Sequence, residues 1–255
     1  MTEDQDSKPF VLLKRIQGHI ERRYPSWNLD AALRYLPVAG HLDRLRPDNV
    51  LDVGSAGTGL SRYWGKRTIG LDVHIDPREV GPLTTPVMGS GACLPFRDES
   101  VDVVVSSDVL EHVPVPDRSE MLSEMIRVAR REVIIAVPCG RASHLAEMEV
   151  NAVYREKTGS SHPWLKEHLL YGLPEARTLE QVIRSLALAH GKDTSIEVKG
   201  NMNLWLWRRL FRHYLGGGPR TARAIRYYML ALIPLLRHMN WGHTYRKIFF
   251  VRLSA

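Results

Sequence analysis

A glycine-rich turn in the first quarter of the chain has the residue types that bind a nucleoside-like ligand. An apolar run over 49–53 leads into Gly54-Ser55-Ala56-Gly57-Thr58-Gly59. Such a run is typical of a buried strand, and the glycines allow a tight turn that a ligand can approach closely. Asp72 lies near the end of the next apolar run, 68–73. A carboxylate there can accept hydrogen bonds from both ribose hydroxyls of an adenosine ligand, so the pattern predicts a nucleoside site at strand ends.

The spacing of the glycines argues against a dinucleotide. The dinucleotide pattern Gly-x-Gly-x-x-Gly requires glycine at its third and sixth positions. Counted from Gly54, the third position is Ala56, and counted from Gly57, the sixth is Arg62, so neither start fits. Asp52 precedes the first glycine and would repel a pyrophosphate. It suits a ligand that carries an amino group and a sulfonium cation. The alternative is a tight turn with no ligand in another kind of α/β protein.

Strand-like and helical patterns alternate along most of the chain. Strands are predicted over 49–53, 68–73, 86–88, 101–106, 132–137, 195–199 and 246–252, and helices over 10–23, 28–45, 117–130 and 178–190. Thr178 is the predicted N-cap of the last helix. This alternation predicts an α/β fold with a parallel sheet and right-handed crossovers.

The length of 255 residues and the hydrophobic content of 44% favour one domain over two. We therefore predict a single domain over 1–255 that carries three additions to the sheet. These are an N-terminal helical extension over 1–47, a lid-like insertion over 138–177 and a basic amphipathic helical insertion over 201–244.

The turn, Asp72 and the segment 94–113 together resemble class I methyltransferases of the type 11 group. That segment reads Leu-Pro-Phe-Arg-Asp-Glu-Ser-Val-Asp-Val-Val-Val-Ser-Ser-Asp-Val-Leu-Glu-His-Val. The resemblance covers about residues 48–137. It implies a Rossmann-like, doubly wound, seven-stranded and mostly parallel sheet whose last strand is antiparallel, with S-adenosylmethionine across the strand ends.

The resemblance also implies which residues bind this cofactor. They are Asp52, Gly54, Ser55, Gly57 and Gly59 at the methionine part, Asp72 and Val73 at the ribose, Ser90, Ala92 and Cys93 near the adenine, and Ser107 and Asp108 after the fourth strand. Two features depart from the family. The turn is one residue longer than Gly-x-Gly-x-Gly, and no acid stands shortly before Leu94, where Ser90 remains as an acceptor.

Methyl transfer from a sulfonium is a direct displacement, so the enzyme mainly aligns the reactants. A hydroxyl nucleophile must also lose its proton to a base. The candidates are His112 after the fourth strand and His162, Glu167 and His168 in the lid-like insertion, which also holds His144. Ordinary hydrogen bonds of a lid, or a helix cap at His112, are the alternatives. His162 and His168 lie six apart, not at the i, i+4 spacing of a helical zinc motif, and no Cys pair helps, so we predict no metal.

The basic insertion is distinguished by its charge. No Asp or Glu follows Glu197, whereas eleven Lys or Arg do. A helix is predicted over 203–214, with Leu204, Trp207 and Tyr214 on one face and Trp205, Arg208, Arg209 and Arg212 around the other. A second helix follows Gly216-Gly217-Gly218-Pro219, carries Arg220, Arg223 and Arg226 near its start, and is kinked at Pro234. Such helices suit peripheral contact with a membrane. Packing on the sheet, a homo-oligomer contact and nucleic-acid binding are the alternatives.

We therefore predict an S-adenosylmethionine-dependent methyltransferase that methylates an oxygen of a small or lipid-linked acceptor, such as a glycan precursor. An RNA methyltransferase and a non-catalytic adaptor are the alternatives. A cytoplasmic location, at the inner membrane face, is predicted because residues 1–8 lack the apolar core of a secretory signal. The two cysteines, Cys93 and Cys139, match no metal-ligand spacing and are predicted to be free thiols.

Overall fold

The computed structural model describes residues 15, 18–216 and 229–254. Its centre is a seven-stranded sheet with the strand order β3-β2-β1-β4-β5-β7-β6. The strands are β1 (Val50–Val53), β2 (Thr68–Asp72), β3 (Thr84–Met88), β4 (Val101–Ser107), β5 (Ala129–Pro138), β6 (Asp193–Asn203) and β7 (Thr244–Ser254). Only β7, the last strand, pairs antiparallel, with β5 on one side and β6 on the other. The predicted fold class is confirmed.

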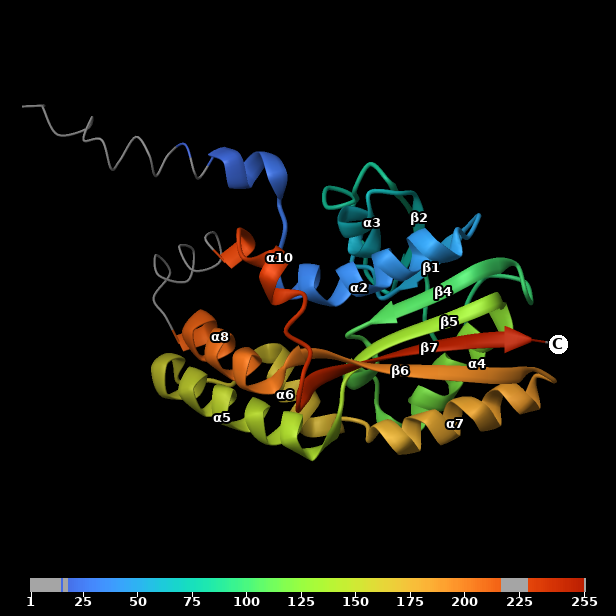
Figure 1. Cartoon of the computed structure of the whole chain (residues 1–255). Helices are drawn as coiled ribbons and strands as arrows, with labels where there is room; N and C mark the ends of the chain where they lie inside the picture. Colours follow the sequence, from blue (N-terminus) through green and yellow to red (C-terminus); the bar gives the residue numbers. More distant parts are fainter. Residues whose placement is uncertain (1–14, 16–17, 217–228, 255) are drawn as a thin grey trace, which may run out of the picture.

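The central strands are buried along their whole length because helices cover both faces of the sheet. Every residue of β1 and β4 is buried, as is typical of parallel strands between two helical layers. Helices α2 (Leu29–Leu45) and α3 (Gly59–Trp64) pack on one face, and α4 (Arg118–Val128) and α7 (Ala176–Ala189) pack on the other (Figure 1). The carboxyl ends of β1, β2 and β4 therefore open on the same edge.

A group of helices lies beyond that edge, at the left of Figure 1. It comprises α5 (Gly140–Thr158), α6 (Pro163–Tyr171), α8 (Leu204–Gly216) and the short helices η1 (Leu110–His112), η2 (Val115–Asp117) and α10 (Ile233–Leu236). The predicted lid-like insertion thus folds as α5 and α6. In the part of the chain described here, no helix has both the length and the apolar character needed to cross a membrane.

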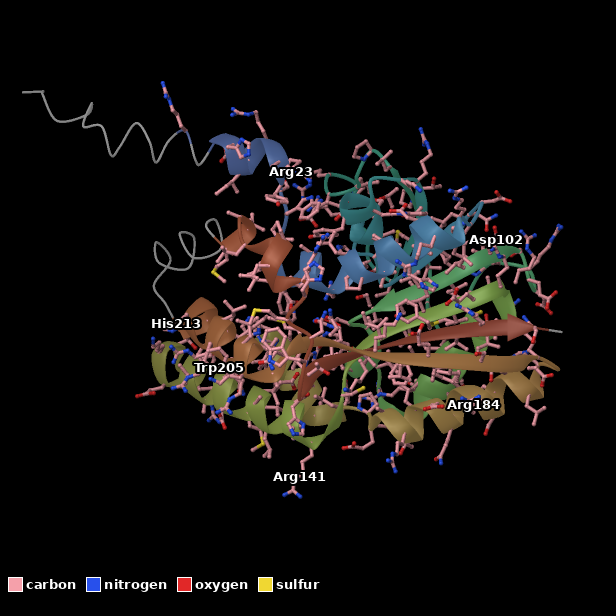
Figure 2. The ribbon with its side chains drawn as sticks, in the orientation of Figure 1. Arg23, Asp102, Arg141, Arg184, Trp205 and His213 are labelled. Carbon is pink, nitrogen blue, oxygen red and sulfur yellow. The ribbon has the colours of Figure 1, made fainter. Side chains whose placement is uncertain are left out.

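Helix α8 has a buried side and an exposed side. Trp207 is 1% exposed and its ring stacks on Tyr245 with 4.0 Å between the ring centroids, whereas Trp205 is 62% exposed. Figure 2 shows Trp205 and His213 on this helix. The apolar face of α8 packs mainly on α5, so this face belongs to the core, as the packing alternative stated.

Two predictions about the helices differ from the structure. Thr178 is not an N-cap, because α7 begins at Ala176 and the last extended residue is Glu175. Thr178 therefore falls inside the first turn. Pro234 does not kink a long helix but stands in the first turn of the short α10. Residues 10–14, Arg220, Arg223 and Arg226 lie outside the described residues.

Candidate active site

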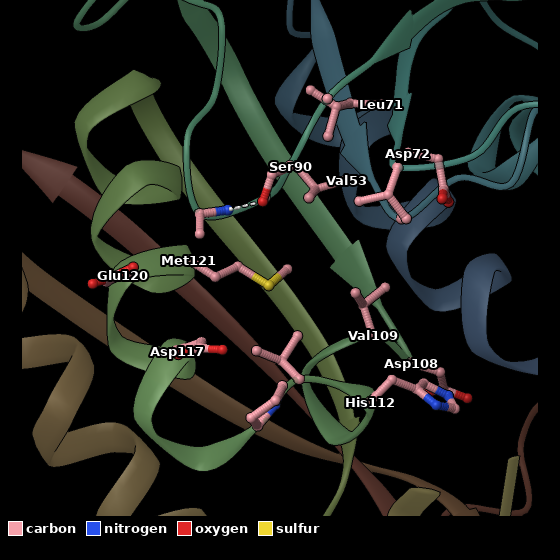
Figure 3. A pocket seen from close by; sticks show the side chains of 17 residues that line it. Val53, Leu71, Asp72, Ser90, Asp108, Val109, His112, Asp117, Glu120 and Met121 are labelled. Carbon is pink, nitrogen blue, oxygen red and sulfur yellow. Dashed lines mark hydrogen bonds between the residues drawn. The ribbon is translucent and has the colours of Figure 1, made fainter.

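The larger of two neighbouring pockets opens at the carboxyl ends of β1, β2 and β4, with a volume of about 710 Å³. We call it the large pocket. Its wall comprises Val53, Gly54, Leu71, Asp72, Val73, Gly89, Ser90, Gly91, Ala92, Asp108, Val109, His112, Val113, Pro114, Asp117, Glu120 and Met121. Figure 3 looks into it: Asp72 lies on the same side as Asp108 and His112, and Met121 lies opposite. The pocket combines apolar walls with carboxylates, as a nucleoside site requires.

Asp72 is half-buried at the end of β2, where the sequence predicted a ribose ligand. One carboxylate oxygen accepts a hydrogen bond from the Ala56 N–H at 2.9 Å, and the other accepts from the His74 N–H at 3.2 Å. Each oxygen of an ionised carboxylate can accept two hydrogen bonds, so each retains one free position. Two neighbouring hydroxyl groups can therefore bind here.

The turn after β1 requires glycine at Gly54. This residue has φ +82°, and a Cβ there would lie 2.2 Å from Cγ2 of Val109. Its N–H donates to the carbonyl of Leu71 at 2.7 Å, which ties the turn to β2. The Gly54 backbone can thus form part of the wall of the large pocket only because it carries no side chain.

Asp52 is buried beneath the turn and does not line the large pocket. Its Oδ2 accepts a hydrogen bond from the Leu60 N–H at 2.7 Å, at the start of α3. A Cβ on Gly59 would lie 2.0 Å from that oxygen, so glycine is needed here as well. Burial raises the pKa of the Asp52 carboxyl to about 7. In this structure Asp52 holds the turn, and its contact with a ligand remains a prediction.

The other predicted cofactor residues divide by position. Those on the wall of the large pocket, together with Gly54 and Asp72, are Val73, Ser90, Ala92 and Asp108, whereas Ser55, Gly57, Gly59, Cys93 and Ser107 lie off it. Ser55 and Ser107 are buried within the fold. The Cys93 backbone is turned by a hydrogen bond to the carbonyl of Ser90, and the Ser90 hydroxyl accepts from the Ala92 N–H. Ala92 and Ser90, rather than Cys93, therefore face this pocket.

The second pocket, the small pocket, has a volume of about 250 Å³. It lies among α2, η1, α6, α8 and β7. Its wall comprises Asp30, Arg34, Gly54, Ala56, Asp108, Glu111, His112, His162, Trp164, Leu165, His168, Trp207, Phe211, Leu215, Tyr245 and Arg246. Gly54, Asp108 and His112 belong to the walls of both pockets, so the two cavities meet at these residues.

Three of the four predicted catalytic residues, His112, His162 and His168, line the small pocket, whereas Glu167 lies off its wall and is exposed. His112 Nδ1 lies 2.6 Å from a Glu167 carboxylate oxygen, and His168 Nδ1 lies 2.9 Å from Oε1 of Glu147. The two imidazoles face each other with their Nε2 atoms 3.2 Å apart. The Tyr245 hydroxyl donates to the same Glu147 oxygen at 2.6 Å. Two His–carboxylate pairs thus meet ring to ring.

The environment shifts the pKa values of these groups in opposite directions. Burial and the charge of His168 lower the pKa of His112. Burial alone would lower the pKa of His168, but the hydrogen bond to Glu147 and the negative charges of Glu147, Glu111 and Asp108 together outweigh it, and the net shift is upward. Burial and the charge of Asp108 raise the pKa of Glu111 to about 8. His162 also lines the small pocket, with its pKa lowered by burial.

A buried ionic cluster also lines the small pocket. Asp108 accepts from Arg34 Nη1 at 2.9 Å and also binds both Nε and Nη2 of Arg246. Burial opposes ionisation of Asp108, but the two guanidinium groups outweigh it and lower its pKa to about 2. Asp108 also has φ +52°, which is uncommon for a residue other than glycine and is typical of functional sites.

Four residues of this site were missed by the sequence argument. Arg34 and Arg246 come from α2 and β7, and Glu147 comes from the middle of α5, so no local pattern connects them. Glu111 stands beside His112 in the segment that carried the resemblance, and that position was a usable signal. The metal argument compared only His162 with His168, whereas the structure places Glu111 and His112 next to His168.

Comparison with known proteins identifies a methyltransferase domain within the chain. Residues 51–137 match the type 11 family described as a methyltransferase domain. A methyltransferase from Mycobacteroides abscessus is 42% identical over 100 residues, which cover 34% of this chain and 37% of that protein. The methyltransferase domain of bacterial CtHen1-C is 14% identical with a TM-score of 0.52, covering 89% of this chain and 100% of that domain. A SAM-dependent methyltransferase from Thermotoga maritima is 13% identical with a TM-score of 0.51, covering 93% and 98%.

Residues 51–137, from β1 to β5, therefore match a type 11 methyltransferase domain. The structural neighbours show that the whole sheet has the fold of methyltransferases that use S-adenosylmethionine. The match spans only about a third of the length of the curated relative. The activity of the whole chain and its acceptor are therefore proposals that rest on the geometry of the site.

Proposed function

We propose that this chain transfers a methyl group from S-adenosylmethionine in the large pocket to a hydroxyl oxygen of an acceptor in the small pocket. The observation that carries the proposal is the junction of the two cavities at Gly54, Asp108 and His112. A donor and an acceptor in neighbouring cavities can meet only where the walls are shared. Holding both in place converts a bimolecular step into an effectively unimolecular one.

The large pocket fits the donor. Asp72 has two free acceptor positions for the ribose hydroxyls. Val53, Leu71 and Met121 supply an apolar wall for a purine. When bound, the donor supplies a sulfonium methyl group: the acceptor oxygen forms a bond to the methyl carbon while the carbon–sulfur bond breaks and leaves its electron pair on sulfur.

The small pocket fits an acceptor that has both polar and apolar parts. Trp207, Phe211 and Leu215 come from the inward face of α8, whereas Arg34 and Arg246 belong to the ionic cluster. The imidazoles of the pocket stand where the hydroxyl must lose its proton. Glu147 and Glu167 fix the orientation of two of these rings through their Nδ1 atoms.

The acceptor class proposed from the sequence, a small or lipid-linked molecule near a membrane, gains support from the surface beside the small pocket. Trp205, Leu235 and Trp241 are each about 60% exposed and lie on or next to α8 and α10, the helices of the basic insertion. Aromatic side chains near basic ones are typical of contact with a membrane interface. We propose that this surface brings the active site to lipid.

The proposal is tested by incubating the full chain and labelled donor with cell extract, then separating lipid, RNA, protein and small molecules. Label in the lipid or small-molecule fraction supports it, and label in RNA would instead support an RNA methyltransferase. No label despite tight S-adenosylhomocysteine binding would favour the adaptor alternative. The variant His168→Gln should retain S-adenosylhomocysteine binding and lose transfer, because His168 lies on the small pocket alone.

Membrane contact is tested separately by flotation with vesicles of anionic and neutral lipid. The double variant Trp205→Ser, Trp241→Ser should reduce flotation with anionic vesicles. Leu188→Ser on α7 serves as the control because this side chain is also exposed and lies off both pockets. Equal flotation of all three proteins would contradict the membrane part of the proposal and leave the methyltransferase part intact.

A further inference from the structure

The facing histidines at the small pocket each have a carboxylate beside Nδ1. His168 Nδ1 lies 2.9 Å from Oε1 of Glu147, which also accepts a hydrogen bond from the Tyr245 hydroxyl. His112 Nδ1 lies 2.6 Å from a carboxylate oxygen of Glu167. The Nε2 atoms of the two rings are left facing each other across 3.2 Å.

Two arrangements fit this geometry: a hydrogen bond between the two rings, or a metal ion bound to both Nε2 atoms. Glu111 distinguishes the two. Its side chain is completely buried, and neither carboxylate oxygen receives a hydrogen bond from another residue in the described part of the chain. Buried polar groups without partners are rare and costly. A proton shared by His112 and His168 would leave Glu111 without a partner, whereas a metal ion can bind all three.

We propose that Glu111, His112 and His168 bind a divalent transition metal ion of the Mn²⁺ to Zn²⁺ series. One ligating atom from each residue lies within 4.8 Å of the others, close enough to share one ion. Two imidazoles and one carboxylate form a ligand set used by catalytic Zn²⁺ and by other first-row ions, whereas Mg²⁺ prefers oxygen ligands.

The surroundings of the three residues support this assignment. Imidazoles that bind a metal almost always donate their other N–H to a carboxylate or carbonyl, which fixes the ring and raises its basicity. Both rings have a carboxylate within hydrogen-bond distance of Nδ1, Glu147 for His168 and Glu167 for His112. By contrast His41 pairs with the buried Glu132 but faces no second histidine. The double His–carboxylate arrangement is thus more than a pair of ordinary buried hydrogen bonds.

The role of the ion rests on the proposed function. Glu111, His112 and His168 supply three ligands, and the remaining coordination positions would open on the small pocket, whose wall all three residues share. An ion there would hold the acceptor hydroxyl and lower its pKa, so that its proton passes to water before the oxygen attacks the methyl carbon. The imidazoles would then serve as ligands rather than as bases. An acceptor with two adjacent hydroxyl groups would gain most.

Metal binding is measured on the full chain after treatment with a chelator and dialysis. We expect one Co²⁺ or Zn²⁺ per chain by calorimetry and elemental analysis, with a visible Co²⁺ absorption spectrum that responds to ligand changes. Glu111→Gln and His168→Gln should weaken Zn²⁺ binding by more than about 100-fold, because each removes a ligand. Glu147→Gln should weaken it by about 10–100-fold, as expected for the partner of a ligand.

His41→Gln is the matched control, since it removes a buried histidine that is also bonded to a glutamate. It should bind Zn²⁺ as the wild type does. His112→Gln, at the partly exposed end of the set, provides a second ligand variant if Glu111→Gln fails to fold. Folding of each variant is checked by thermal unfolding without metal.

The inference is overturned if the wild type binds no stoichiometric Zn²⁺, Co²⁺ or Mn²⁺, or if the ligand variants bind as tightly as His41→Gln. S-adenosylhomocysteine binding by the same preparations separates this result from the proposed function. Metal binding without nucleoside binding would refute the methyltransferase proposal alone, and nucleoside binding without metal binding would refute the metal site alone.

Discussion

Replacement of Asp72 by Ala should weaken S-adenosylhomocysteine binding by about 100-fold. The carboxylate has two free acceptor positions at the edge of the large pocket, one on each oxygen. A hydrogen bond to a charged group contributes about 1.5–3 kcal/mol, and Asp72 is only half-buried, so the lower value applies to each of two ribose hydroxyls. The sum of about 3 kcal/mol corresponds to about two decades in Kd.

The bonds of Asp72 to the N–H groups of Ala56 and His74 are lost in the free and the bound protein alike. They therefore affect stability, by about 1 kcal/mol each, more than affinity. Calorimetry should thus show a weaker but still saturable interaction. The control is Asp76→Ala on the following loop, where the carboxylate pairs with Arg78 and lies off the pocket wall. An Asp72→Ala Kd within about threefold of the wild-type value would refute the ribose role.

Three further variants test how the site is built. The pKa of Asp52 is about 7 in the folded protein and near 4 in the unfolded chain, so the wild type should lose about 4 kcal/mol of unfolding free energy as the pH rises from 4 to 7. Asp52→Asn should remove this pH dependence, as measured by urea unfolding. Gly54→Ala should unfold at a lower temperature than Gly65→Ala. Both glycines have positive φ, but only a Cβ at position 54 would lie 2.2 Å from the side chain of Val109. Equal melting temperatures would show that this contact does not destabilise the fold. Arg246→Leu should lower the free energy of unfolding in urea by about 3 kcal/mol, because it removes one of the two guanidinium partners of the buried Asp108 carboxylate. A change below about 1 kcal/mol would show that the ionic cluster does not stabilise the fold.

Much of the fold followed from local patterns. The apolar runs at 49–53 and 101–106 correspond to β1 and β4, and the end of the sequence forms the antiparallel β7. These strands were predictable because a strand between two helical layers is buried on both faces and is therefore mostly apolar. Thr178 shows the limit: α7 begins two residues before it, and such a short shift of a helix end leaves the apolar pattern unchanged.

The cofactor half of the site was also accessible from sequence, since Gly54 and Asp72 lie at the ends of adjacent parallel strands. Strand order alone brings such residues together. The amphipathic pattern of α8 was equally clear, with Trp207 inward and Trp205 outward. What the pattern could not specify is the surface that covers the inward face. An apolar stripe has the same periodicity whether it meets a membrane, a partner or α5.

The sequence by itself determined the residue types of this protein: a glycine turn with an acid on the next strand, a set of histidines after β5, and a basic end. The tertiary structure alone decided that His112 and His168 face each other, with the buried Glu111 beside them and Glu147 behind His168. These residues come from η1, α5 and α6. Contacts between elements distant in sequence depend on how whole helices pack, and no local pattern records that packing.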